Sequence, residues 1–399
     1  MQAFRLETGR TIAPLGDGVG ACLVLNQPLR LVQEQALAAA GYSLVQTPDP
    51  LSPTLVFSDR TWFTAALVRK LSAWAGPGRL VIDDADYLRF TEPLQPGPLE
   101  IGVLAAGAAP TLDALLAQPE HLEALGLADL PSPNRHPAFR HALVPIRAGA
   151  AMVAGIDHWS HLLKVNLLAL AASGFEARAA FDALPAWSRT FRALTVLWRA
   201  GSTEPAKIGR ALSEIGPRCR IHPTAVVEAC RLGADVEVGA FAVVRGSVVG
   251  DGARIEEHTY VGLSVVGAGA QVARHTMVNL SVLLPGALVS AGDGFQLCLF
   301  GRDSFVARGV TALDLSFGKP ISVDHDGERR SSESWFLGVA LGHGVRVGAG
   351  VRLAYGLAVP NNSLLVAPAD DLVRRIEFGE GALSARQGVA VPVTRKEAE

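Results

Sequence analysis

A short hydrophobic repeat runs through much of the second half of this sequence. From position 221 to position 306, aliphatic or aromatic residues recur at intervals of six, six and five residues, which together give a period of 17. One position of this period is occupied in successive repeats by Ile221, Val238, Ile255, Val272, Val289 and Val306. Three short strands per period, each with one inward side chain, form a triangular coil, and stacked coils bury a continuous core. The repeat therefore predicts a parallel β-helix with coils of 17–18 residues.

The repeat covers roughly residues 219–306 and 337–366, and the stretch between them does not follow it. That stretch is rich in glycine, serine and charge, and it includes the run from Asp324 to Ser332. An irregular excursion of about 30 residues from a solenoid is usually a functional loop or a subunit contact. We therefore expect a β-helix over 215–370 with a loop insertion at about 307–336, followed by a polar tail at 371–399.

The first 200 residues alternate strand-like and helix-like patterns, which indicates an α/β layer architecture. We predict strands at 23–25, 42–45, 54–59 and 79–84, and helices at 31–40 and 62–75. Trp187 and Trp198 lie within a helical pattern over 181–200, and we interpret them as the packing face of a helix that joins the two domains.

Composition excludes several classes of protein. Charged residues make up 19% of the chain and the formal net charge is −2, so the basic surface of a nucleic-acid-binding protein is not expected. The four cysteines are scattered, which favours reduced thiols in a cytoplasm. The N-terminus carries charges where a signal peptide is apolar, and no apolar run reaches the length of about 18 residues that predicts a membrane span.

Several segments resemble known families. Val261–Val272 resembles the hexapeptide-repeat transferases, which fold as left-handed β-helices and form homotrimers. Leu25-Asn-Gln-Pro-Leu and His158–Asn166 resemble segments of sugar-phosphate nucleotidyltransferases. Residues 318–323 and 336–350 resemble the closing coils of bifunctional sugar-1-phosphate nucleotidyltransferase/acetyltransferases. The resemblance implies a sugar-phosphate or nucleotide-sugar substrate and acetyl-CoA, or another acyl-CoA, as the acyl donor.

The nucleotidyltransferase-like domain departs from its family and is interpreted as degenerate. The family holds a triphosphate with a glycine-rich loop that carries an arginine and a lysine. The corresponding stretch, Gly16–Cys22, contains neither residue, and no lysine precedes Asn26. The family also needs an aspartate to hold Mg²⁺, which this domain would use only if it is active; the candidates are Asp59, Asp83, Asp84 and Asp86.

A hexapeptide acyltransferase needs a histidine as general base. In the family register this histidine falls near Ala291, and a conserved asparagine falls near Leu313 or Asp314, so both are altered. His258 and His275 are one period apart and should stack on one corner at about the 4.8 Å strand spacing. They are interpreted as an exposed ladder, as catalytic bases or as metal ligands.

His343 is a third catalytic candidate, because it lies beside the loop insertion between Gly342 and Gly344; the alternative is a simple turn residue. Arg329 and Arg330, in the loop, are candidates to clamp a phosphate, or a solvated charge pair.

Asp314 and Lys319 complete the candidate substrate-binding set. His325 is expected to be solvated, whereas His158 and His161 are expected to cap a helix or line a domain interface.

Three functions remain open. The first is a transferase acting on a sugar phosphate or nucleotide sugar, by acyl transfer at the β-helix. The second is a non-catalytic relative that binds a ligand or serves as a scaffold, and the third is an active sugar-phosphate nucleotidyltransferase.

Overall fold

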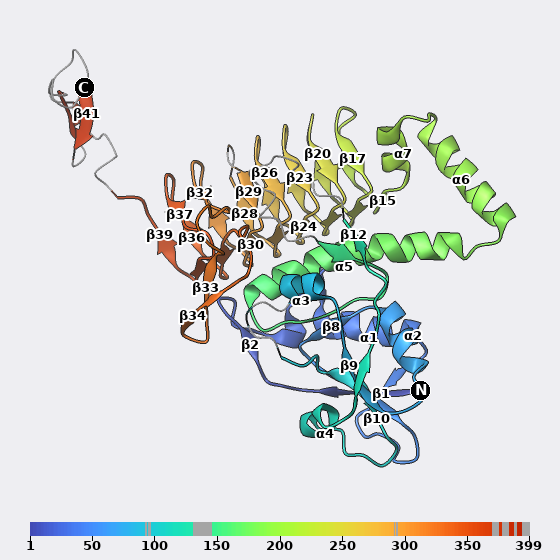
Figure 1. The fold of residues 1–399 in the computed structure, drawn as a ribbon. Coiled ribbons are helices and arrows are strands. Elements are labelled where there is room, and N and C mark those ends of the chain that lie inside the picture. Colours follow the sequence, from blue (N-terminus) through green and yellow to red (C-terminus); the bar gives the residue numbers. More distant parts are fainter. Residues whose placement is uncertain are drawn as a thin grey trace.

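The computed structural model describes residues 1–91, 94, 97–130, 146–290, 292 and 294–368, and the backbone of residues 375–376, 383–386 and 389–392. An α/β domain and a β-helix lie against each other, with the long helix α5 (Trp159–Asp182) between them (Figure 1).

The N-terminal domain is built on a six-stranded sheet. From one edge to the other its strands are β11 (Glu120–Leu122), β9 (Gly78–Val81), β10 (Ile101–Leu104), β7 (Thr54–Ser58), β1 (Gln2–Leu6) and β6 (Ser43–Leu44). Neighbouring strands are parallel except at β10, which is antiparallel to β7 and β9. All five residues of β7 are buried, as in a central strand covered on both faces. The carboxyl ends of β1 and β7 meet at one edge of the sheet, where open α/β sheets usually bind ligands.

Helices pack on this sheet and connect it to the β-helix. They are α1 (Leu29–Ala39), α2 (Ala65–Ser72), α3 (Ala85–Thr91), α4 (Leu112–Leu116), α5, α6 (Ala186–Ala200) and α7 (Pro205–Ala211). The Thr64 hydroxyl caps α2 by accepting from the Leu67 amide. After α1 the chain turns at Gly41, whose φ of +80° favours glycine.

Short two-stranded pairs complete the domain. These are β2 (Thr11–Ile12) with β3 (Asp17–Gly18), β4 (Leu23–Val24) with β5 (Gln27–Pro28), β14 (Val153–Gly155) with β8 (Thr61–Phe63), and β12 (Ala128–Asp129) with β13 (Arg147–Ala148); η1 is the 3₁₀ turn Val19–Ala21.

The first strand of the sheet differs from the prediction. Leu23–Val24 pairs only locally with Gln27–Pro28, whereas Gln2–Leu6 lies inside the main sheet between β6 and β7. The predicted helix at 62–75 is also shorter, because Trp62 and Phe63 belong to β8. The loop that follows the first strand is therefore Glu7–Arg10 and not the glycine-rich stretch from Gly16.

The second half is a left-handed parallel β-helix, as predicted. Its first sheet contains β15 (Glu214–Ile215), β18 (Arg231–Leu232), β21 (Val248–Val249), β24 (Val265–Val266), β27 (Val282–Leu283), β30 (Leu299–Phe300), β35 (Ala340–Leu341) and β38 (Ala358–Val359). Its second sheet contains β16 (Arg220–Ile221), β19 (Glu237–Val238), β22 (Arg254–Ile255), β25 (Gln271–Val272), β28 (Leu288–Val289), β31 (Phe305–Val306), β36 (Arg346–Val347) and β39 (Leu364–Leu365).

The third sheet contains β17 (Val226–Glu228), β20 (Val243–Arg245), β23 (Tyr260–Gly262), β26 (Met277–Asn279) and β29 (Gly294–Gln296), and it continues as the pair β32 (Thr311–Ala312) and β37 (Arg352–Leu353). The predicted inward positions from Val227 to Val306 are each at most 3% exposed and form one core. The 17-residue repeat is therefore the spacing of inward side chains in stacked coils.

The chain leaves the coils between β32 and β35. This excursion carries the antiparallel hairpin of β33 (Ser322–His325) and β34 (Glu328–Ser331), which extends toward the α/β domain (Figure 1). Beyond the coils, β40 (Arg375–Ile376), β41 (Leu383–Arg386) and β42 (Val389–Pro392) form a small sheet in the order β40-β42-β41. The other residues of the predicted tail at 371–399 lie outside the described part of the chain.

A hydrophobic cluster, separate from the core inside the coils, joins the two halves. Val265, Val282 and Leu299 of the first sheet belong to the same buried cluster as Trp159 and Leu162 of α5. One face of the β-helix is thus covered by the N-terminal domain.

Helix α6 does not take part in this packing, contrary to the interpretation of its tryptophans. Trp187 is 76% exposed and Trp198 is 82% exposed. The amphipathic spacing predicts the helix correctly, but only the tertiary structure shows that its apolar face is turned away from both domains.

Candidate functional site

The two stacked histidines lie on an exposed corner of the β-helix. The rings of His258 and His275 are 5.0 Å apart with 11° between their planes, and the ring of Phe241 continues the stack 5.1 Å from His258. All three residues have φ between +57° and +59°, because each occupies the same tight corner in successive coils. The predicted stacking of the two histidines is confirmed. The sequence prediction did not include Phe241, which extends the stack.

A groove borders this corner along the second sheet. It has a volume of about 620 Å³ and is lined by His222 and by the charged residues Arg220, Glu237, Arg254, Glu256, Glu257 and Arg274. Arg274 pairs with Glu257 at 3.0 Å and with Glu256 at 3.5 Å, directly beside His258. Hydrogen bonding within Glu257 itself lowers the pKa of its carboxyl group, and the charge of Arg274 contributes to the same shift. The corner therefore combines two imidazoles with fixed carboxylates and guanidinium groups.

His343 lies in the contact between the β-helix and the N-terminal domain. Its Nδ1 accepts a hydrogen bond from the Arg302 amide at 2.8 Å, and its Nε2 lies 3.3 Å from a carboxylate oxygen of Asp17. Arg302 pairs with the same carboxylate at 2.8 Å, and Asn361 donates to the Leu15 carbonyl at 2.7 Å. These contacts fasten the β2–β3 hairpin to the β-helix. The hairpin overlaps the start of Gly16–Cys22, the stretch that corresponds to the phosphate-binding loop of nucleotidyltransferases.

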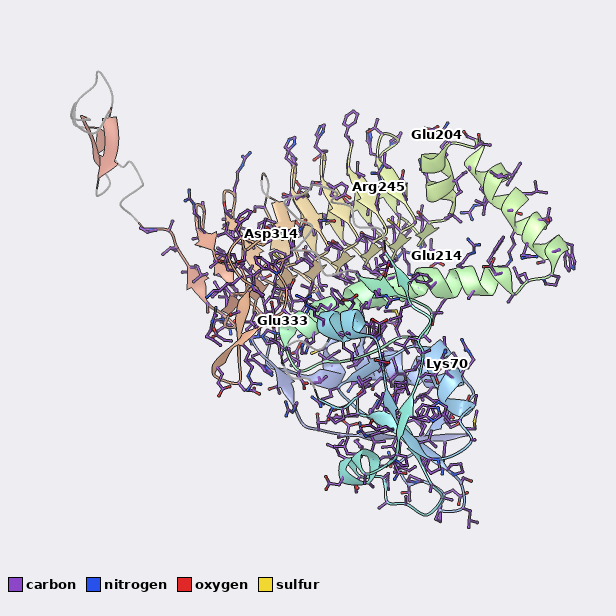
Figure 2. All side chains as sticks on the ribbon, in the orientation of Figure 1. Lys70, Glu204, Glu214, Arg245, Asp314 and Glu333 are labelled. Carbon is purple, nitrogen blue, oxygen red and sulfur yellow. The ribbon has the colours of Figure 1, made fainter. Side chains whose placement is uncertain are left out.

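The four predicted substrate-binding residues are spread over the excursion and are not brought together. Arg329 pairs with Asp324 at 3.4 Å and Arg330 with Glu328 at 2.9 Å, all within one hairpin. Asp314 lies at the start of the excursion, where burial raises the pKa of its carboxyl group (Figure 2). Lys319 is exposed. Ala291, the position of the family histidine, lies outside the described residues.

The histidines at the start of α5 form a buried cluster with the excursion. His158 caps α5 by accepting from the Ser160 amide, and its other ring nitrogen lies 3.2 Å from the Asp324 carbonyl, which confirms a capping and interface role. His325 is only 3% exposed and its ring lies 5.5 Å from that of His158, so the expectation that it is solvated is wrong. The hairpin folds back over α5 and removes His325 from water.

Burial dominates the electrostatics of this cluster. It lowers the pKa of His158 to about 3 and lowers the pKa of His161 well below its usual value. Lys164, one turn further along α5, is 5% exposed, and burial lowers its pKa to about 7. The neutral imidazole is therefore the stable form of His158 and His161.

A second group of charges gathers at the carboxyl edge of the sheet, and sequence reasoning missed most of it. Arg60 forms ion pairs with Glu100 and Asp157, with one Nε to Oε2 distance of 2.7 Å to Glu100. Arg10, in the loop after β1, lies 3.6 Å from Asp157. Thr8 donates to Asp59 at 2.7 Å. The apolar residues Ala3, Phe4 and Leu6 are a sequence signal for β1, and placing that strand directs attention to Arg10 in the loop that follows it.

The carboxylates of Glu100, Asp157 and Asp59 already have partners within the domain. Burial alone would raise the pKa of Glu100, but the hydrogen bonds and charge of Arg60 outweigh it and hold that pKa below its usual range. Burial raises the pKa of Asp59. Among the residues that the structure describes, no group of three or more His, Cys, Asp and Glu side chains is arranged to hold a metal ion.

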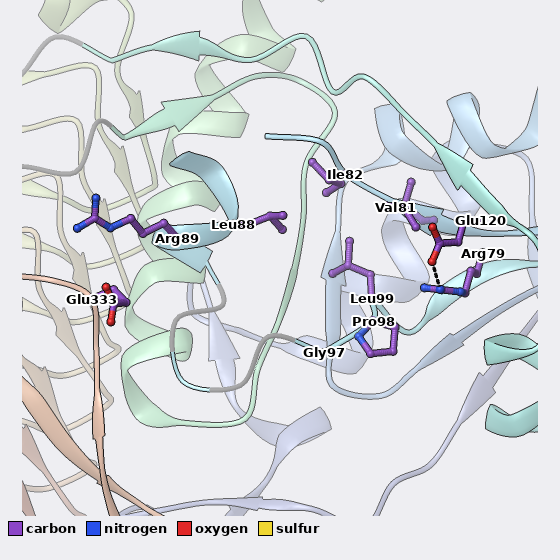
Figure 3. A pocket seen from close by; sticks show the side chains of 11 residues that line it. Arg79, Val81, Ile82, Leu88, Arg89, Gly97, Pro98, Leu99, Glu120 and Glu333 are labelled. Atoms are coloured by element: carbon purple, nitrogen blue, oxygen red, sulfur yellow. Dashed lines mark hydrogen bonds and ion pairs between the residues drawn. The ribbon is translucent and has the colours of Figure 1, made fainter. Parts of the chain in front are cut away.

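A cavity of about 380 Å³ lies where the domain meets the excursion (Figure 3). Val81, Ile82, Leu88 and Leu99 give it an apolar wall. The paired Arg79 and Glu120 close one end, and Arg89 and Glu333 stand at the other. Its size and its few convergent charges are typical of a small-molecule pocket.

The first coils of the β-helix match a known family model. Residues 199–292 match the family model of the GMPPB C-terminal domain, a sugar nucleotidyltransferase family. No curated protein matches the chain. One matching solved structure is a Bacillus cereus protein solved as a candidate acetyltransferase, 16% identical, with 38% of this chain and 77% of that chain covered and a TM-score of 0.17. Another is the polySia-specific acetyltransferase NeuO, 14% identical, with 46% and 87% covered and a TM-score of 0.16.

In the part of the chain that the structure describes, no helix is long and apolar enough to cross a membrane. The match at 199–292 spans α7 and the first coils. Over these residues this protein is similar to the C-terminal domain of a sugar nucleotidyltransferase.

Proposed function

We propose that this protein is a transferase that acts on a sugar phosphate or nucleotide sugar, with acyl transfer from acyl-CoA at the corner of its β-helix. The observation that carries the proposal is the His258–His275 stack beside a charged groove of about 620 Å³. A groove of this size accommodates part of a nucleotide-sized ligand, and its guanidinium groups are suited to phosphates. The similarity of residues 199–292 to a sugar nucleotidyltransferase domain supports the substrate class.

In this proposal one imidazole acts as general base. It takes the proton from a sugar hydroxyl or amine while the oxygen or nitrogen attacks the thioester carbonyl of acyl-CoA. A bond forms from that atom to the acyl carbon, the carbon–sulfur bond breaks, and the departing thiolate of CoA receives the proton from the imidazolium. A homotrimer would place this corner beside a second chain, and sedimentation velocity tests that assembly.

The junction cavity favours a second candidate, in which the N-terminal domain binds a ligand without catalysis. Arg60 is held by two carboxylates and the β2–β3 hairpin is fastened by His343, so neither is free to hold a triphosphate. The cavity of about 380 Å³ remains large enough for a sugar phosphate. Nucleotidyl transfer is the third candidate, for which Arg10 would supply the cation in the loop after β1.

Release of CoA thiol in the presence of acetyl-CoA and a panel of sugar phosphates and nucleotide sugars tests the proposal. His258→Ala or His275→Ala is expected to lower the rate about 100-fold, the usual contribution of a general base. Leu263→Ala is the matched control, because Leu263 is an exposed residue with a φ of +46° at a tight corner of the same β-helix and does not line the groove.

Thermal denaturation separates the candidates, because a ligand of the folded state raises the melting temperature. Stabilisation by a sugar phosphate without any CoA release or CoA binding would favour the ligand-binding relative. Pyrophosphate release from UTP or dTTP with a sugar phosphate would instead identify a nucleotidyltransferase.

A further inference from the structure

Helix α6 presents a stripe of large apolar side chains to open space. Trp187, Phe191, Leu194 and Trp198 follow one another at intervals of four, three and four residues, which places them on one helical face. Their exposed fractions are 76%, 69%, 58% and 82%. Exposing a contiguous patch of two tryptophans, a phenylalanine and a leucine is unusual on a surface with no partner.

The stripe faces away from the rest of the molecule. The residues of α6 that are partly covered include Val196 and Ala200, which lie on the opposite side of the helix from Trp187 and Trp198. Helix α6 packs against α7 and stands at the end of the molecule beside the first coils, where Figure 1 and Figure 2 show its outer side free of other segments.

The charges around the stripe have one sign. Arg189, Arg192 and Arg199 lie on α6, and no aspartate or glutamate occurs between residues 183 and 203. The whole chain has a formal net charge of −2, so this segment is a local positive region on a slightly acidic protein. The remaining polar residues of α6 are serine and threonine.

Helix α6 carries tryptophan, phenylalanine and leucine on one face, and its only charged residues, on the other faces, are arginines. This composition is typical of a helix that lies in a lipid–water interface. Such a helix buries its apolar face at the level of the headgroups, while long basic side chains reach the anionic lipids. We propose that α6 docks this protein on the surface of an anionic lipid bilayer, parallel to the membrane plane. This docking is independent of the acyl-transfer proposal.

Sedimentation of the full-length protein with vesicles tests the docking. We expect co-sedimentation with phosphatidylcholine vesicles that contain one quarter phosphatidylglycerol, and little with phosphatidylcholine alone. Replacing both tryptophans (Trp187→Ser and Trp198→Ser) should weaken binding about tenfold or more, because their apolar area would no longer be buried in lipid. Replacing two arginines (Arg192→Gln and Arg199→Gln) should weaken it about fivefold per charge and reduce its salt dependence.

The matched control is Phe317→Ser, which removes an 84% exposed aromatic side chain from the excursion and should leave vesicle binding unchanged. The wild-type protein provides a second measurement that needs no variant. Its tryptophan emission should shift to shorter wavelength on binding and be quenched by brominated lipid, since Trp187 and Trp198 would enter the interface.

Three outcomes would overturn the proposal. In the first, the wild-type protein does not bind phosphatidylglycerol vesicles at low salt. In the second, the tryptophan variant has an unchanged melting temperature and binds vesicles as well as the wild type. In the third, the wild type is an oligomer that does not bind vesicles, and the tryptophan substitutions dissociate it. The last outcome would assign the stripe to a second copy of this chain.

Discussion

At the scale of single residues, the most unusual group is Lys164. It lies on α5 among buried histidines, 5% exposed, with its ammonium nitrogen 5.3 Å from the centre of the Phe90 ring. Burial lowers its pKa to about 7, whereas in the unfolded chain it titrates near 10.5. The folded protein therefore carries a group whose charged form is destabilising.

The sign of the effect on stability follows from this difference. Between pH 7 and 10.5 the unfolded state binds a proton that the folded state does not, so stability rises with pH in this window. The penalty is complete below pH 7 and disappears above the pKa of the unfolded state. The two pKa values differ by about 3.5, which corresponds to about 5 kcal/mol.

We predict that Lys164→Met stabilises the protein at pH 6 by up to about 5 kcal/mol, and by less than half of that gain at pH 9. Urea unfolding at the two pH values measures both numbers. Lys207→Met, at an exposed lysine of α7 that pairs with Glu204, is the control and should change neither. An equal gain at both pH values would show that the lysine is not the source of the pH dependence.

At the scale of elements, the coils depend on close approach of their backbones. A side chain at Gly342 would bring a Cβ within 2.7 Å of the Asn361 amide nitrogen in the next coil. Gly318, on the excursion, has open space at the same position and an ordinary φ. The two glycines therefore provide a matched pair for testing coil packing.

Gly342→Ala is expected to lower the free energy of unfolding by about 2–3 kcal/mol, because neighbouring coils must separate to admit the methyl group. Gly318→Ala should change it by less than about 0.5 kcal/mol. Chemical denaturation of both variants provides the comparison. A similar loss in the two proteins would contradict the coil packing described here.

At the scale of the whole molecule, the contact among Asp17, Arg302 and His343 joins residues that are nearly the length of the chain apart. It fastens the β2–β3 hairpin of the N-terminal domain to the final coils. Its side chains are between 19% and 33% exposed, so solvent screens the contact only in part. The contact couples the two domains beyond the hydrophobic cluster that joins them.

We expect His343→Ala to cost about 1–3 kcal/mol, because Asp17 and the Arg302 amide each lose a partner at a partly buried contact. Hydrogen exchange should become faster in the β2–β3 hairpin and stay unchanged in the coils between residues 220 and 290. His222→Ala serves as the control. A loss of acyl transfer without either change would instead assign His343 to catalysis.

The repeat positions by themselves determined the β-helix, its 17-residue coil and the stacking of His258 on His275. The physical reason is that a solenoid contacts only its neighbours, so a fixed spacing in sequence becomes a fixed spacing in space. Amphipathic spacing similarly placed helix α1 and the helix that carries Trp187 and Trp198.

Tertiary structure alone decided which surfaces are covered. The burial of His325, the exposure of Trp187 and the ion pairs of Arg60 with Glu100 and Asp157 each depend on segments far apart in the sequence. The reason is that burial, ion pairing and the pKa values that follow from them arise from the packing of one domain on another, which no local pattern of residues records.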